Sequence, residues 1–265
     1  MYSKYSPKGL LSPEEIYRVL KQKGMNLVTL TDQNTFSGCL DFLHKYPYRK
    51  DFVPGEEIWA YDPQFHMHVR FSVYGLNETQ HTEIHRLKEN VEECIQYIQN
   101  ERLVYVLLHP FEDRKNPYGL APFISSLLKL FSVFEVHHGK IFEEHNTMLA
   151  YFIKGLTEKG ICGGSHARTP KFMGSTFTVS QGHTLETFFQ DLKTGKTYTQ
   201  GAHGTPKRFR HEFQKNTKNL FQFLFSQTRF WSYKKQQRKL TPIWSEILGE
   251  SQLNPCELPE KLIDL

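Results

Sequence analysis

The sequence predicts an α/β barrel, because short apolar strands alternate with amphipathic helices and several strands end in a polar side chain. Four of these strands run into Asp32, His109, His138 and His166. In an α/β barrel the carboxyl ends of the strands meet at one rim, where side chains that are far apart in sequence form one site. We therefore expect the four strand ends to lie together.

Capping signals predict the first helix. Ser12 stands at the N-cap, Pro13 at the first helical position, and Glu15 three residues after the cap. This combination satisfies the free backbone N–H groups at the start of a helix. Gly24 ends the helix, and a strand over residues 26–31 follows.

Hydrophobic periodicity predicts the remaining elements. Alternating apolar residues indicate a strand over 65–76, and apolar residues at helical spacing indicate a long helix over 82–100. The other predicted helices are 35–46, 121–131, 145–158 and 184–194, and the other predicted strands are 103–108, 132–137 and 160–163. Helix and strand alternate, which predicts a mostly parallel sheet that is closed or nearly closed.

The composition excludes several classes of protein. With 265 residues and 38% hydrophobic residues, the chain is typical of a soluble globular protein. No apolar run approaches the roughly 18 residues that span a bilayer, and the first residues lack the apolar segment of a signal peptide, so we expect a cytoplasmic protein. The four cysteines lack C-x-x-C spacing, which indicates reduced thiols.

The positive charge is concentrated near the end of the chain. The net charge is +5, and much of the excess falls within 193–239. We expect two regions, a barrel over 1–200 and a basic, aromatic-rich helical extension over 201–265. Aromatic and basic residues alternate over 219–235, a composition that suits nucleic acid or an anionic membrane surface. The helical spacing of its apolar residues more commonly reflects packing on the barrel or on a second subunit. The sequence leaves the oligomeric state open.

Five segments in order resemble motifs of the PHP family, the polymerase and histidinol phosphatase domain. They are Ser3-Lys4-Tyr5-Ser6 with Ser12-Pro13-Glu14-Glu15, then Thr31-Asp32-Gln33-Asn34-Thr35, Gly55-Glu56-Glu57, His109-Pro110, and Gly164-Ser165-His166-Ala167-Arg168. The resemblance covers about residues 2–205. It implies a distorted (β/α)₇ barrel with up to three divalent metals, zinc, manganese or iron, whose bound hydroxide hydrolyses phosphoesters.

Carried over residue by residue, the resemblance implies metal ligands at Glu57, His109, His138 and His166. Asp32 would support them as a catalytic residue, with Arg168 as the second catalytic candidate. His68 is an additional candidate for the lining of the site.

Several family positions carry a different residue here. Tyr2 and Gln33 stand where the family has histidine, His166 where it has aspartate, and Arg168 where it has histidine. A guanidinium is permanently charged and repels a metal ion, whereas it binds phosphate in bidentate fashion. Arg168 can equally form a salt bridge with Glu57 or Glu135.

Three functions follow as alternatives. The first is a divergent metal-dependent phosphoesterase acting on a small phosphorylated molecule. The second is an inactive pseudoenzyme that binds a phosphorylated ligand or a protein partner without metal. The third is a polyanion-binding module that acts through the extension. His81 and His85 lie four apart on a helix, but no third ligand is evident, so we expect them to be exposed.

Overall fold

The computed structural model describes residues 1–7, 9–109, 120–156 and 159–214. The predicted extension lies outside the described residues from 215 onward, and so does Pro110 of the His-Pro motif. Residues Met1–Pro110 and Leu130–Glu212 form one compact unit. Helix α5 (Leu120–Leu130) belongs mainly to a second unit.

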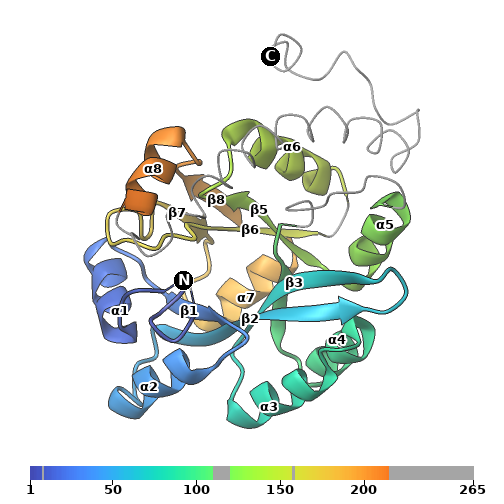
Figure 1. Cartoon of the computed structure of the whole chain (residues 1–265), viewed down its shortest axis with the longest axis horizontal. Coiled ribbons are helices and arrows are strands. Elements are labelled where there is room, and N and C mark those ends of the chain that lie inside the picture. The colour runs from blue at the N-terminus through green and yellow to red at the C-terminus, as the bar shows by residue number, and fades with distance from the viewer. Residues whose placement is uncertain (8, 110–119, 157–158, 215–265) are drawn as a thin grey trace. The chain divides into compact units, whose positions relative to one another are not determined.

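A curled six-stranded sheet forms the centre of the first unit (Figure 1). Its strands are β1 (Val28–Gln33), β2 (Phe52–Asp62), β3 (Met67–Tyr74), β4 (Val104–Leu107), β5 (Val133–His138) and β6 (Gly160–Gly164), in that spatial order. A separate antiparallel pair joins β7 (Thr176–Val179) to β8 (Tyr198–Gly201). The prediction of an α/β fold with a barrel-like sheet is confirmed.

The sheet is mixed rather than mostly parallel. β1 runs parallel to β2, and β4, β5 and β6 are parallel to one another. β3 runs antiparallel to both of its neighbours. The difference arises because β2 is a strand that the sequence did not predict. Pro54 and the two charged residues after Gly55 are typical of a loop, yet they lie inside β2.

The helices surround the sheet, and most begin where the sequence predicted. They are α1 (Pro13–Gln22), α2 (Ser37–Lys45), α3 (Glu78–Leu87), α4 (Val91–Asn100), α6 (Glu143–Lys154), α7 (Leu185–Lys193) and α8 (Pro206–Gln214). Ser12 and Glu15 form the predicted capping box of α1. The single helix predicted over 82–100 is two helices, because Asn90 caps a new start by accepting hydrogen bonds from the backbone N–H groups of Glu92 and Glu93. In the described part of the chain, every helix is too short or too polar to span a bilayer.

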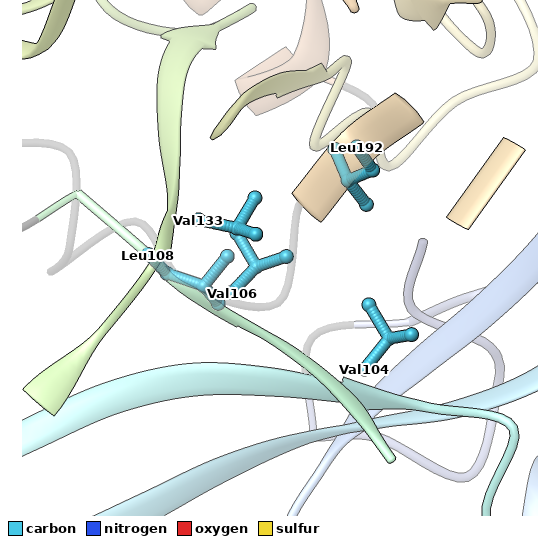
Figure 2. Close-up of a cluster of buried hydrophobic side chains, with 5 residues drawn as sticks. All are labelled: Val104, Val106, Leu108, Val133 and Leu192. Carbon is cyan, nitrogen blue, oxygen red and sulfur yellow. The ribbon is translucent and has the colours of Figure 1, made fainter. Parts of the chain in front are cut away.

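A cluster of buried aliphatic side chains joins α7 to the strands (Figure 2). Val104, Val106 and Leu108 alternate along β4 and the residue after it, so all three point to one face of the sheet. Val133 of β5 and Leu192 of α7 complete the cluster. Burial of each such side chain contributes about 1.5–3 kcal/mol. The cluster fixes the positions of β4 and β5, whose ends carry the histidines described next.

Candidate metal centre

A β-bulge in β5 places Glu135 and His138 on the same side of the sheet. Residues three apart in a regular strand point to opposite faces. The pairing of β5 with β6 shifts register between Glu135 and His137, so β5 holds one extra residue there. The extra residue resets the alternation of side chains. Both Glu135 and His138 consequently reach His166, which follows the end of β6.

Glu135, His138 and His166 form a group that could hold a metal ion. Nε2 of His166 lies 2.5 Å from Oε1 of Glu135. The rings of His138 and His166 stack with their centroids 3.7 Å apart. One candidate ligand atom of each residue lies within 4.8 Å of the others. One carboxylate and two imidazoles are a donor set that zinc, manganese and iron accept. We call these three residues the β5–β6 trio.

Two more imidazoles extend the trio into a row of histidines. The ring of His109 meets His138 edge to face at 5.0 Å, and stacks with the ring of His145 at 5.8 Å. His109 and His145 are both buried. Backbone N–H of Lys140 donates to Nδ1 of His138 over 3.1 Å, which orients that ring. The strand ends of β4, β5 and β6 thus meet, as the sequence predicted.

Three residues that follow strand ends have left-handed backbone conformations. Asn34 follows β1 with φ 51°, His109 follows β4 with φ 36°, and His166 follows β6 with φ 46°. Side chains other than glycine adopt this region rarely, and such strain concentrates at functional sites. The strain at His109 and His166 supports a functional role for this rim.

Glu57 lies in the middle of β2, and both of its carboxylate oxygens accept hydrogen bonds. The hydroxyl of Tyr2 donates to Oε2, and Nε1 of Trp59 donates to Oε1 over 2.7 Å. Gln33 is paired with Glu57 in the register of β1 and β2. Among the described residues, the groups of three or more candidate donors within 4.8 Å contain neither Glu57 nor His109. The structure therefore brings Tyr2, Gln33 and Glu57 together. The donors that it gathers for a metal at the rim are Glu135, His138 and His166 instead.

Asp32 holds the first residues of the chain. Its two oxygens accept hydrogen bonds of 2.5 Å from the backbone N–H and the hydroxyl of Ser3. Burial raises the pKa of Asp32, while the two bonds from Ser3 act in the opposite direction. The arrangement gives Asp32 a positioning role at the β1 strand end.

Replacing Gly38 with alanine should destabilise the protein by about 1–3 kcal/mol through overpacking. Gly38 lies in α2, and a Cβ there would stand 2.6 Å from the hydroxyl of Ser3 and closer still to Oδ2 of Asp32. Alanine normally stabilises a helix relative to glycine by about 1 kcal/mol, so the expected sign is reversed. Urea unfolding measures the change. Gly155→Ala is the control, because its Cβ would meet nothing closer than 3.4 Å. Equal stability of Gly38→Ala and wild type would contradict the role of this contact.

Cations gather behind the loop that carries His166. The backbone N–H of Arg168 donates to Glu212 over 3.3 Å, and Nζ of Lys140 lies 3.1 Å from the same carboxylate. Arg208 donates to the carbonyl of Ser165 over 2.6 Å. Burial lowers the pKa of Lys140 to about 8, although Glu212 opposes the shift. Lys140 and Arg208 both pair with the carboxylate of Glu212. The charge of Arg168 also lowers the pKa of Lys140, so positive charge exceeds negative charge on this side of the rim.

The remaining candidates lie elsewhere. His68 is exposed on β3 and packs on the ring of Tyr61 at 5.4 Å. It pairs with Tyr61, which lies four residues, or about 13 Å, along β2 from Glu57, so the structure does not bring His68 near Glu57. The prediction that His81 and His85 lack a third ligand is wrong, because both contact Glu56.

Sequence reasoning missed two residues of the site, Glu135 and His145. The sequence suggests Glu135 only as an ion-pair partner of Arg168, whereas its carboxylate pairs with His166. Glu135 lies three residues before His138, and in a regular strand this spacing places two side chains on opposite faces of the sheet. Only the bulge brings them to the same face. His145 lies in α6, where nothing but its place after a strand end connects it to the row of histidines.

Comparison with known proteins finds similarity of fold to solved structures. No family model and no curated protein matches the sequence. A two-domain protein of Bacteroides vulgatus containing a predicted PHP-like metal-dependent phosphoesterase shares 18% identity, with a TM-score of 0.54 over 81% of this chain and 68% of that chain.

Two further solved structures agree. A lesion-specific endonuclease from Pyrococcus furiosus gives a TM-score of 0.53 at 16% identity, over 75% of this chain and 56% of that chain. A putative metal-dependent phosphoesterase of Bifidobacterium adolescentis gives 0.52 at 14% identity, over 73% and 94%. At these identities the likenesses lie in the fold. The chain has the fold of the PHP-like metal-dependent phosphoesterases.

Proposed function

We propose that this protein is a metal-dependent phosphoesterase that holds one divalent metal through Glu135, His138 and His166. The observation that carries the proposal is the β5–β6 trio, a carboxylate and two imidazoles gathered at the ends of two strands. The donor set fits zinc, manganese or iron. The fold supports the proposal, because two solved structures that share it are described as a predicted PHP-like and a putative metal-dependent phosphoesterase.

The residues around the trio have separate tasks in this proposal. A bound divalent metal supplies Lewis acidity toward a phosphoryl oxygen. Lys140, Arg168 and Arg208 attract the phosphate group, since charge-assisted hydrogen bonds to phosphate are strong. The imidazole of His109, buried against His138 and His145, can accept or deliver a proton at the rim. A small phosphorylated molecule is the substrate class that this charge distribution favours.

A second function is binding of a phosphorylated ligand without hydrolysis. Two observations favour it. Tyr2 and Trp59 each donate to one oxygen of Glu57, so a second metal would compete with these hydrogen bonds. Arg168 and Gln33 stand at two further positions where the resembling family carries metal-binding histidines. In this function the three cations hold the ligand, and no bond is broken.

Metal content and turnover separate the two functions. Protein purified without chelator is analysed for zinc, manganese and iron, alongside His138→Gln. We then assay p-nitrophenyl phosphate and bis-p-nitrophenyl phosphate with each metal added. We expect His138→Gln to hold one equivalent less than wild type and to lose turnover. The exposed His183 gives the matched control His183→Gln, which should behave as wild type.

The opposite results are equally informative. Equal metal content in wild type and His138→Gln would show that the trio holds no metal. A metal difference with no turnover on either substrate, together with tight binding of phosphate, would favour the binding function. Loss of metal in His183→Gln as well would show that the losses arise from general misfolding.

A further inference from the structure

We propose a second divalent transition-metal site, formed by Glu56, His81 and His85 on the outer side of β2. It shares no residue with the β5–β6 trio. The three residues offer one carboxylate and two imidazoles, and one ligand atom of each lies within 4.8 Å of the others. We call them the β2–α3 trio.

The strand alternation separates this site from the rim. Adjacent residues in a strand point to opposite faces, so Glu56 and Glu57 point away from each other. Glu57 turns toward Tyr2 and Trp59, whereas Glu56 turns toward α3. The site thus lies on the opposite face of β2 from Glu57. Since the two trios share no residue, a variant in one removes no ligand of the other.

Glu56 is buried in a way that demands a positive or proton-donating partner. Its side chain is fully buried. An isolated carboxylate in such a place is costly, and buried charges are paired or coordinate metals. Oε2 lies 2.6 Å from Nδ1 of His81, and Oε1 lies 2.7 Å from Nε2 of His85. Both carboxylate oxygens are thus directed at imidazole nitrogens.

Helix α3 presents the two histidines as a pair. His81 and His85 are four residues apart, so they lie on one face of the helix, and their ring centroids are 4.3 Å apart. The Asn77–Gln80 capping box fixes the start of α3, and the ring of Phe36 stacks on His81 at 5.7 Å. Each histidine side chain remains 23% exposed, so an ion can enter from solvent.

The geometry needs only a small opening to take a metal. Ligand atoms in a tetrahedral zinc site lie about 3.3 Å apart, given bonds of about 2.0–2.1 Å. The two nitrogen–oxygen separations here are 2.6 and 2.7 Å, so they must widen by about 0.6–0.7 Å. The metal takes the place of the protons that the imidazoles share with the carboxylate. Two imidazoles and a carboxylate suit Zn²⁺ and Co²⁺, with water in the fourth position.

The competing explanation is a hydrogen-bonded trio that only satisfies Glu56. Both explanations predict that removal of a histidine destabilises α3. Only the metal site predicts that added Zn²⁺ raises the melting temperature through these residues. At a hundredfold excess of free Zn²⁺ over the dissociation constant, the rise should be on the order of 5 °C.

Full-length His138→Gln, in which the rim site is disabled, is the protein to test first. Zn²⁺ alone is titrated against a chromophoric chelator, and Co²⁺ binding is followed by visible absorption. We expect His138→Gln to bind one Zn²⁺ and to show the intense Co²⁺ bands of a low-coordinate site. If His138→Gln binds no Zn²⁺, the proposed site does not exist, regardless of how the other variants behave.

A double variant then assigns the ion. His138→Gln/His85→Gln should bind no Zn²⁺ and should lose the Zn²⁺-dependent rise in melting temperature, while retaining the circular dichroism of the parent. The exposed His68 provides the control His138→Gln/His68→Gln, which should bind as the parent does. Undiminished binding in the His85 variant would refute the site. The single variant His85→Gln should retain phosphoester turnover. Loss of Zn²⁺ binding at the β2–α3 trio and loss of turnover at the β5–β6 trio can therefore be told apart.

Discussion

Replacing Glu135 with glutamine should remove the metal from the β5–β6 trio and abolish phosphoester hydrolysis. Glu135 is the only carboxylate of the trio, and a neutral amide binds divalent metals weakly. The change also removes the anionic partner of His166. Loss of an outer partner of a metal ligand costs about 10–100-fold in affinity or activity, and loss of a direct ligand should cost more. Elemental analysis and turnover with added metal measure both effects.

The control for this experiment is Glu144→Gln, which removes one negative charge from an exposed position on α6. It should leave metal content and turnover unchanged. Glu135→Gln that keeps its metal and its turnover would exclude Glu135 as a ligand. Reduced turnover with full metal content would instead indicate that Glu135 orients His166 without holding the ion.

Acidification should destabilise the protein between about pH 6.5 and 4 because His137 is buried and neutral. Burial, and then the neighbouring His203, lower the pKa of His137 from 6.5 to about 4. The unfolded chain therefore binds a proton more readily than the folded protein. Stability is fully present above pH 6.5 and falls as the pH drops toward 4. The free energy of unfolding should fall by about 1.4 kcal/mol per pH unit in this window, up to about 3 kcal/mol.

Urea unfolding across this pH range in wild type and His137→Gln isolates the effect. The glutamine variant should lack this part of the pH dependence, while the exposed-site variant His183→Gln should keep it. Parallel pH profiles of wild type and His137→Gln would mean that His137 does not resist protonation. The ring of His137 stacks on His203 at 4.2 Å, so charging one of them places a cation against the other.

The fold class could be predicted from the sequence because the signals that indicate it are local. The capping box at Ser12 and the hydrophobic periodicity of the strands are set by neighbouring residues, and both are present in the structure. β2 escaped prediction because Pro54 is rare inside strands. Pro54 faces Leu30 of β1 in the parallel ladder, and only tertiary pairing reveals that position as a strand.

The site was harder to predict because side-chain direction depends on backbone detail. The three strand-end histidines at 109, 138 and 166 meet as expected, since strand ends converge at one rim. Glu135 joins them only because the bulge reverses the alternation of β5. Likewise, Glu56 could be connected to His81 and His85 only once α3 was known to lie over the outer side of β2.

The bulge in β5 also has an evolutionary meaning. One extra residue decides whether Glu135 and His138 share a face, so a single-codon insertion or deletion can create or erase the trio while the barrel persists. An alignment that scores residue identities column by column would register this event as a gap and miss the change in chemistry.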